Sequence, residues 1–256
     1  MTQPSGARQD APADVPAPGG IAPPTAPARQ RWRLVVALPA PSGVDRGAAA
    51  AAGWSWPALL SSSGLPVAGE RAGRGRVTPA APLPLGVAGE GEVVDLFLAE
   101  RLPVWAVRAA VTAVLPAGTS LVDLYDIWVG APSAPASVVA ADYRVLLAGP
   151  PRWAVEAAVL ALLGAAALPR ERRREKKTVA YDLRPLVLSL EVRASDGSGM
   201  TLAMRLRHAP DAVGRPEEVV AALGEPPASL QEAPTVRSIV RARIVMADDP
   251  DASPAR

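Results

Sequence analysis

Apolar and polar residues alternate along several short stretches of this chain, as they do in half-buried β-strands. In residues 200–209, for example, Leu202, Met204 and Leu206 alternate with arginines. The pattern also predicts one or two strands in residues 175–194 and a proline-broken edge strand in residues 76–87. Further strands are predicted at residues 31–38, 91–102, 119–130, 137–149 and 235–247.

Helices are predicted where apolar residues recur every three or four positions. Residues 102–118 carry such a stripe of valines, and residues 215–224 open with proline and close with glycine. Residues 47–64 are a weaker candidate, because glycine and proline interrupt an alanine-rich run. The helix predicted for residues 150–168 has proline in its first turn and an apolar face formed by Val155, Ala158, Val159 and Leu162.

These elements follow the order βαββαβ on both sides of a break rich in proline, glycine and alanine at residues 130–135. That order is the ferredoxin-like arrangement. We therefore expect an α+β protein made of two tandem ferredoxin-like domains with antiparallel sheets, at residues 31–131 and 137–247. The expected repeat is one of element order, without sequence identity between the halves.

Both ends of the chain are expected to be disordered tails. Residues 1–30 contain seven prolines and almost no large apolar side chain. Such a segment cannot bury enough surface to offset the entropy of ordering it. Residues 248–256 have the same character.

The composition excludes several classes of chemistry. The chain has no cysteine, which excludes disulfides, zinc–cysteine sites, cysteine nucleophiles and iron–sulfur clusters held by this chain. It has one histidine, His208, which excludes an imidazole-rich metal site. We therefore expect no cofactor, no metal site and no assigned catalytic residue, with His208 as a surface or capping residue.

Neither a membrane segment nor a signal peptide is expected. The charge-free apolar run at residues 157–168 has 12 residues, whereas a membrane-spanning helix needs roughly 20. The N-terminus lacks a basic region followed by an apolar core. We therefore expect a cytoplasmic protein. Its formal net charge is only +2, so a nucleic-acid site would have to be a local patch.

One short stretch concentrates positive charge. Residues 170–177 hold six basic and two acidic residues, a local net charge of +4. Such an arm can contact RNA phosphates or an acidic face of a partner protein. The alternative is a solvated edge strand whose charges prevent edge-to-edge pairing. The candidate binding residues are Arg170, Arg172, Arg173, Arg174, Lys176, Lys177 and the downstream Arg184.

Asp182 and Arg184 lie two positions apart, so on a strand they share a face. We predict that Asp182 belongs to a structural ion pair, with Arg184, Arg237 or Arg241 as its partner. Arg184 precedes a proline, which holds it extended and suits an anchoring role. Tyr181 is the one aromatic residue near the basic stretch, so sequence-specific readout of bases is not expected.

The phrase "DLRPLVLSLEV" at residues 182–192, with "KKT" just upstream, resembles a bacterial family of radical-SAM-linked domains of unknown function. Members occur fused to the C-terminus of B12-type radical SAM proteins or encoded beside them. Two histidine phrases of that family are missing here, at residues 43–53 and 69–79, so we expect a divergent member with a degenerate first half. Other phrases fit the family in order: "APLPLGVAGEGEVVDLFL" (81–98), "VLPAG" (114–118), "RLRH" (205–208) and "RPEEVV" (215–220).

The resemblance implies a non-enzymatic accessory protein that binds a radical SAM enzyme, its RNA-type substrate, or both. Radical chemistry needs an iron–sulfur cluster that a cysteine-free chain cannot hold, so that chemistry would belong to the partner. One alternative is an RNA-modifying or RNA-processing enzyme of ferredoxin-like type that uses His208, Asp182 and Arg184. Another is a protein-interaction module that acts through its sheet faces without nucleic acid.

Overall fold

The part of the chain that the structure describes has a mixed α+β architecture built on one large and mostly antiparallel sheet. Most of the N-terminal segment for which disorder is expected, up to residue 25, lies outside the described residues, as do residues 253–256. The computed structural model describes residues 26–39, 55–69, 76–84, 86–174, 177–194, 199–208 and 213–252.

The main sheet contains eight strands and runs through both halves of the chain. Neighbouring strands are antiparallel, except that β10 and β3 are parallel where Val240 pairs with Ala88 and Arg241 with Gly89. The sequence predicts a sheet in each half, and these form one sheet because β10 lies beside β3. The order is β4 (Ser120–Ile127), β1 (Gln30–Leu38), β3 (Ala88–Leu98), β10 (Thr235–Met246), β5 (Val138–Ala148), β9 (Met200–Arg207) and β8 (Val187–Ala194), with β2 (Val77–Pro79) also paired to β3.

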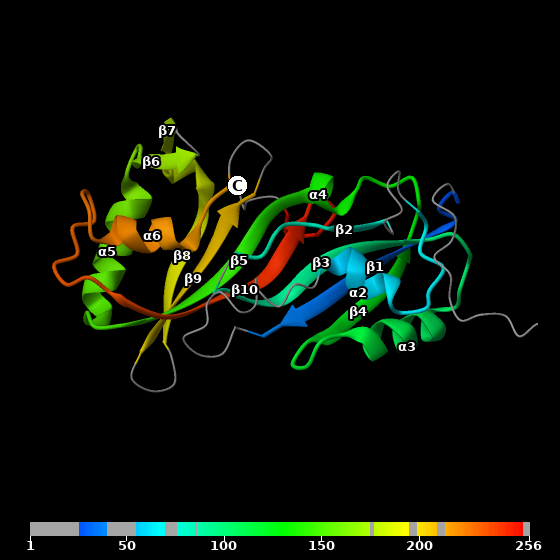
Figure 1. Cartoon of the computed structure of the whole chain (residues 1–256). Helices are drawn as coiled ribbons and strands as arrows, with labels where there is room; N and C mark the ends of the chain where they lie inside the picture. The colour runs from blue at the N-terminus through cyan, green and yellow to red at the C-terminus, as the bar shows by residue number, and fades with distance from the viewer. Residues whose placement is uncertain are drawn as a thin grey trace, which may run out of the picture.

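Four of the helices lie within predicted stretches and are shorter than predicted, whereas the helix Ala134–Ser137 was not predicted and begins inside the break at residues 130–135. They are α2 (Trp56–Ser61), α3 (Val104–Val114), α4 (Ala134–Ser137), α5 (Arg152–Gly164) and α6 (Pro216–Leu223), with a 3₁₀ turn η1 (Arg184–Leu186). Of the weak helix candidate at residues 47–64, residues 47–54 lie outside the described part. The basic stretch forms a separate two-stranded hairpin of β6 (Pro169–Arg174) and β7 (Lys177–Asp182). Figure 1 shows α5, α6 and this hairpin at one end of the molecule, and α2 and α3 at the other.

Each half buries its own apolar cluster between its helices and the sheet. In the second half, all four residues of the stripe predicted on α5 are buried, so that prediction is confirmed. In the first half, α3 buries Val107 and Val111. Burying one such side chain stabilises the fold by roughly 1.5–3 kcal/mol. The two clusters therefore fix the helices to the sheet.

Helices α3 and α5 are built from nearly the same sequence. Residues 103–115, PVWAVRAAVTAVL, and residues 151–163, PRWAVEAAVLALL, are identical at nine of 13 positions. In each helix a proline is the N-cap, the two shared valines are buried, and the tryptophan (Trp105 or Trp153) is 72% exposed. The expectation of no sequence identity between the halves is therefore wrong for these helices.

The two halves meet at a buried ion pair between β10 and β3. Arg241 is 1% exposed, and its Nε donates to Glu92 Oε1 at 2.8 Å. Its Nη1 and Nη2 donate to the carbonyls of Pro82 and Ala81, at 3.1 and 3.2 Å. All three nitrogens of the guanidinium group are thus hydrogen-bonded, as a buried charge requires.

Two glycines of β3 make this junction possible. A Cβ at Gly89 would lie 2.5 Å from Glu92 Cγ, so a side chain there would displace the carboxylate. A Cβ at Gly91 would lie 3.1 Å from the carbonyl oxygen of Ala242. Because glycine has no Cβ, β10 can approach β3 closely at this position. Gly89, Gly91 and Glu92 of the AGEGE sequence at residues 88–92 are therefore all needed for the junction.

A second buried charge cluster fixes the segment that connects the halves. Asp95 is fully buried; its Oδ1 accepts from Arg33 Nε at 2.9 Å, and its Oδ2 accepts from the backbone N–H of Ala134 at 2.7 Å. Arg31 also pairs with Asp95 and donates to two carbonyls of the connecting segment, at 2.7 and 2.8 Å. The break at residues 130–135 is therefore packed against the first-half strands.

The junction is expected to depend on both members of its ion pair. Replacing Glu92 by Gln leaves the Arg241 guanidinium buried without a counter-charge, which should lower the free energy of unfolding by roughly 3–5 kcal/mol. Urea unfolding followed by circular dichroism measures this change. The double variant Glu92→Met/Arg241→Met removes both charges and should be more stable than Glu92→Gln.

The matched control is Arg243→Gln, on the same strand. Arg243 is 42% exposed in its ion pair with Asp251, so its loss should change the free energy of unfolding by less than about 1 kcal/mol. A Glu92→Gln protein as stable as this control would contradict the role assigned to the pair.

Candidate functional site

A cleft of about 830 Å³ lies where the two halves of the chain meet. Its walls come from the segment before β3 (residues 80–84), from α4 and β5, from the end of β9, and from residues 213–218 at the start of α6. Arg172 of β6 and Arg241 of β10 also line it. The cleft therefore collects side chains from segments that are far apart in the sequence.

Backbone pairing holds the end of β9 at this cleft. The N–H of His208 donates to the Val139 carbonyl at 2.9 Å, and His208 forms an isolated bridge with Val213. The next residue, Gly214, packs so closely that a Cβ there would lie 2.9 Å from Leu206 Cβ. His208, Val213 and Gly214 are thus fixed where they line the cleft.

His208 is half-buried in the wall of the cleft. Burial lowers the pKa of its imidazole below the ordinary value of 6.5, and the nearby Arg241 lowers it further. The ring is therefore neutral at pH 7, with one nitrogen able to donate a hydrogen bond and the other able to accept one. The sequence predicts a surface or capping histidine. In the structure, backbone pairing with Val213 places His208 in the wall of the cleft instead.

Tyr143 brings a hydroxyl group to the same cleft from β5. The residue is 4% exposed, and burial raises its pKa, although the neighbouring Arg241 guanidinium opposes the shift. Tyr143 is thus also neutral at pH 7. Two groups with hydrogen-bonding capacity and no charge therefore line the cleft beside the ion pair of the junction.

The hairpin β6–β7 presents one of its faces to α6 and the cleft. Arg170 forms an ion pair with Glu225, just beyond the end of α6. The Arg172 guanidinium lies 5.4 Å from the centroid of the Tyr181 ring, and its Nη2 donates to the Val213 carbonyl at 3.4 Å. These two arginines are therefore packed against the protein and are not freely solvated.

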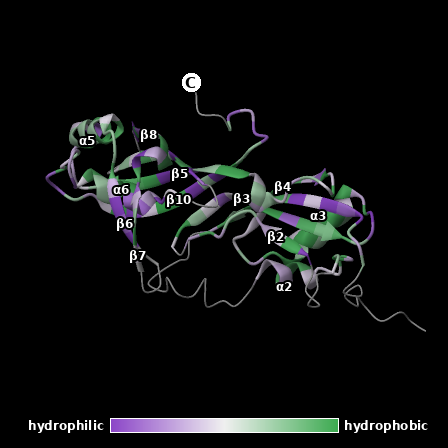
Figure 2. Cartoon of the chain, turned by 90° about the horizontal axis from the view of Figure 1, so that it is seen from above, coloured by the Kyte–Doolittle hydropathy of each residue, from purple (hydrophilic) through white to green (hydrophobic). Residues whose placement is uncertain are grey.

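Three donors on this face of the hairpin are buried and have no hydrogen-bond partner among the described residues: Arg170 Nε, Arg172 Nε and the Tyr181 hydroxyl. Such donors are uncommon in native proteins, where buried polar groups are usually satisfied by protein or by bound molecules. Figure 2 shows β6 as hydrophilic along its length. The side chains of the other predicted binding residues here, Arg173, Arg174, Lys176 and Lys177, lie outside the described part of the structure.

Arg184 does not extend this basic surface. Its Nη2 and Nε donate to the Leu163 carbonyl at 2.9 and 3.1 Å, and its Nη1 donates to the Val187 carbonyl at 3.0 Å. Leu163 lies in the last turn of α5. Arg184 therefore caps the C-terminal end of that helix, where a cation is favourable.

Asp182 is not part of the ion pair predicted for it. Its Oδ1 accepts from the backbone N–H groups of Leu168 and Arg184, at 2.7 and 2.9 Å. Arg241 pairs across the junction instead, and Arg237 is exposed on β10. The physical reason is that β7 and β10 belong to different sheets. Asp182 therefore holds the end of the hairpin and has no place in the cleft.

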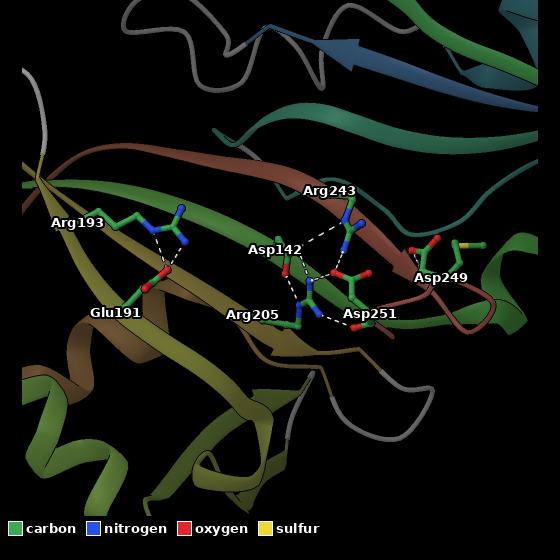
Figure 3. Close-up of polar contacts among 8 residues, drawn as sticks. Asp142, Glu191, Arg193, Arg205, Arg243, Asp249 and Asp251 are labelled. Atoms are coloured by element: carbon green, nitrogen blue, oxygen red, sulfur yellow. Dashed lines mark hydrogen bonds and ion pairs between the residues drawn. The ribbon is translucent and has the colours of Figure 1, made fainter. Parts of the chain in front are cut away.

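The face of the second-half sheet opposite α5 and α6 is also rich in arginine, and Arg205 and Arg243 there are paired with acids. Asp142 accepts from Arg205 Nε at 2.7 Å, and Asp251 accepts from Arg205 and Arg243 at 2.8 and 2.6 Å (Figure 3). Arg205 and Arg243 lower the pKa of Asp251 to about 2. Asp251 stays ionised at neutral pH, and together with Asp142 it pairs with both arginines, so this part of the face offers little unbalanced charge to an acidic partner.

No local motif marks the cleft in the sequence. Tyr143, Arg172, His208 and Arg241 come from four different strands or strand ends, and only the fold brings them together. One part of the cleft has a signal in the sequence: His208 lies only a few positions before the RPEEVV phrase at residues 215–220. The first four residues of that phrase line the same cleft. Within the described residues, no group of three or more His, Asp or Glu side chains could hold a metal ion, and no helix is long and apolar enough to cross a membrane.

Comparisons with known proteins give one family match. Residues 74–216, more than half of the chain, match the family described as "Uncharacterized protein conserved in bacteria (DUF2344)". A comparison with curated proteins finds no match. A solved structure titled "Crystal Structure of a Cbf5-Nop10-Gar1 Complex" matches with a TM-score of 0.45 and 12% identity, over 82% of this chain and 48% of that one. This chain thus spans about half the length of that chain, and at this TM-score we infer nothing from the likeness.

The burial of His208 predicts a pH dependence of stability. Its pKa is lowered on folding, so the unfolded chain binds more protons once the pH falls below about 6.5. The free energy of unfolding should therefore fall as the pH is lowered from 7.5 to about 5.5. Asp251, with its pKa of about 2, does not titrate in this window. Replacing His208 by Gln should make the fall smaller.

Because the chain has one histidine, a proton NMR titration of its imidazole signal measures this pKa directly. We expect a midpoint below 6.5, together with the shallower pH dependence of the His208→Gln protein in urea unfolding. A midpoint at or above 6.5 would show that the imidazole is not held in the wall of the cleft.

Proposed function

We propose a function on the premise that this chain belongs to the bacterial family of uncharacterized proteins DUF2344. In this proposal the chain is a non-enzymatic binding protein that works with a radical SAM enzyme and holds that enzyme's RNA-type substrate. The observation that carries the proposal is the position of the basic hairpin. It is a two-stranded unit separate from the main sheet, and it reaches the cleft through Arg172. The proposal places the protein in the cytoplasm.

The concentration of charge in the hairpin supports an acidic ligand. The whole chain has a formal net charge of +2, whereas residues 170–177 alone carry six basic and two acidic residues. A polyanion would therefore be attracted to this end of the molecule rather than to the whole surface. Arg205 and Arg243 of the open sheet face are paired with Asp142 and Asp251, which leaves the hairpin as the better contact for phosphates.

A radical SAM partner is proposed from the sequence resemblance and from composition. The cysteine-free chain cannot hold the iron–sulfur cluster of radical chemistry, so the chemistry is assigned to the partner. We also infer that each half is a ferredoxin-like unit. The strand orders β4-β1-β3-β2 and β10-β5-β9-β8 support this inference, since each half then has the order fourth, first, third, second.

The enzyme alternative loses support from the positions of its three candidate residues. His208 lines the cleft, whereas Asp182 and Arg184 hold together the hairpin, η1 and the end of α5. Groups that share a reaction must reach the same reacting atoms. Because these three do not converge, we assign none of them a catalytic role.

Exposed apolar side chains favour a protein partner in addition to RNA. Trp153 and Leu160 are 72% and 71% exposed, and their spacing of seven residues places them on the same face of α5. Large exposed apolar groups are typical of protein contact surfaces. We assign this face to the radical SAM enzyme and the hairpin to RNA.

The direct test is RNA binding by a charge-reversed hairpin. In fluorescence anisotropy with a structured RNA at about 50 mM and about 200 mM salt, the chain should bind more weakly at the higher salt. Arg173→Glu/Arg174→Glu should weaken binding by about tenfold or more and reduce the slope against log salt by about 1–2, because phosphate contacts are lost.

The matched control is Arg101→Glu/Arg108→Glu, which changes the net charge equally on exposed residues at the α3 end of the molecule. This variant should bind nearly as well as the unmodified chain. If both variants bind RNA equally, the hairpin is not the contact. Co-elution with the radical SAM protein in the absence of any RNA binding would favour the protein-interaction module.

A further inference from the structure

We propose that the cleft receives one internal nucleotide of the RNA strand held by the basic hairpin, with the base between proline-lined walls and a phosphodiester group on Arg172. This inference rests on the proposed function. It adds where on the protein the RNA strand is contacted and that the contacted unit is a single nucleotide. The volume of about 830 Å³ lies within the range of small-ligand sites, roughly 300–1,000 Å³.

Four prolines from three separate segments give the cleft rigid apolar walls. Pro82 and Pro84 precede β3, Pro135 lies in α4, and Pro216 begins α6. A proline ring has a fixed φ and no N–H, so these walls neither donate hydrogen bonds nor rearrange easily. A flat nucleobase can cover such a wall without losing hydrogen bonds, whereas the hydroxyl groups of a sugar would lose theirs.

Arg172 is the group best placed to bind a phosphate. Its Nη2 makes only a long contact of 3.4 Å with the Val213 carbonyl, and no other hydrogen bond of the guanidinium group lies within the described residues. The ring of Tyr181, 5.4 Å away, supports the guanidinium group. A guanidinium group with unused donors can bind a phosphate through two parallel hydrogen bonds to two phosphate oxygens. Arg241 differs, because all its nitrogens are used at the junction.

Tyr143 and His208 are placed to contact the edge of the base. Both line the cleft and both are neutral at pH 7. The imidazole of His208 can donate or accept a hydrogen bond, and the Tyr143 hydroxyl, which accepts one from Arg241, can donate one. Base edges carry donors and acceptors of the same kind. The cleft thus offers an apolar wall for the face of a base and neutral polar groups for its edge.

The acidic residues of α6 favour a phosphodiester over a terminal phosphate. Glu217 and Glu218 line the same cleft as Arg172 and Arg215, so the two carboxylates offset much of the charge of the two guanidinium groups. A phosphodiester carries one negative charge, whereas a terminal phosphate carries about 1.5 to 2 at pH 7. An internal nucleotide should therefore bind better than a free one.

Arg172→Gln and Arg170→Gln form a matched pair of variants. Both arginines lie on the same face of β6, two positions apart, but Arg170 pairs with Glu225 and is not among the residues that line the cleft. With an oligouridylate of about eight nucleotides as the probe, Arg172→Gln should raise the Kd about tenfold in fluorescence anisotropy. Arg170→Gln removes an equal charge from the hairpin outside the cleft, where it is already paired with Glu225, so it should raise the Kd by about threefold at most.

A second readout reports on the cleft itself. The single imidazole signal of His208 should shift in the NMR spectrum when the oligouridylate is added, and should shift much less with uridine monophosphate at the same concentration. Val213→Trp fills the cleft without changing the charge of the hairpin, so it should remove the shift and weaken binding. Far-UV circular dichroism shows whether this variant is folded.

The outcomes separate the two proposals. If hairpin charge reversal weakens RNA binding but Arg172→Gln binds like Arg170→Gln and the His208 signal does not move, the nucleotide site is overturned while the RNA-binding function stands. If the unmodified chain binds neither the oligouridylate nor structured RNA, both proposals fail. Tighter binding of uridine monophosphate than of the oligonucleotide would overturn the assignment to an internal nucleotide.

Discussion

The structure depends most on the buried ion pair between Arg241 and Glu92. It joins residues that are 149 positions apart, on the last strand of the second half and on β3 of the first half. Arg241 also binds the carbonyls of residues 81 and 82, so a single guanidinium group fixes both the pairing of β10 with β3 and the segment that forms one wall of the cleft. A charge in this position has to keep its partner, because an unpaired buried charge is strongly destabilising.

The properties of the cleft follow from this constraint. Because Arg241 is neutralised by Glu92, the cations left to the cleft are Arg172 of the hairpin and Arg215 at the start of α6. The basic stretch is therefore divided between two roles. Arg170 and Arg172 attach one face of the hairpin to α6 and the cleft, and the rest of the stretch supplies the concentrated charge that we assign to RNA.

Much of the fold could be predicted from the sequence, because the alternation of Leu202, Met204 and Leu206 and the apolar stripe of α5 depend only on neighbours along the chain. The single continuous sheet could not be predicted, since it needs Gly89 and Gly91 to admit a strand from the far end of the sequence. The same limit applies to the site. The basic hairpin is visible as a local run of charge, whereas the cleft exists only where six separate segments meet. The ion pair predicted for Asp182 is wrong because it depends on the same kind of long-range information. Residues that share a face of one strand do not reveal that β7 lies outside the main sheet.

Hydrogen–deuterium exchange of the Glu92→Gln protein tests most directly whether this ion pair holds the halves together and shapes the cleft. We expect protection to fall first and most at residues 80–91 and 239–243, with β8 and β9 keeping nearly all of theirs, because their antiparallel pairing does not involve the junction. An equal loss of protection in all strands, or no loss at residues 80–91, would contradict the account.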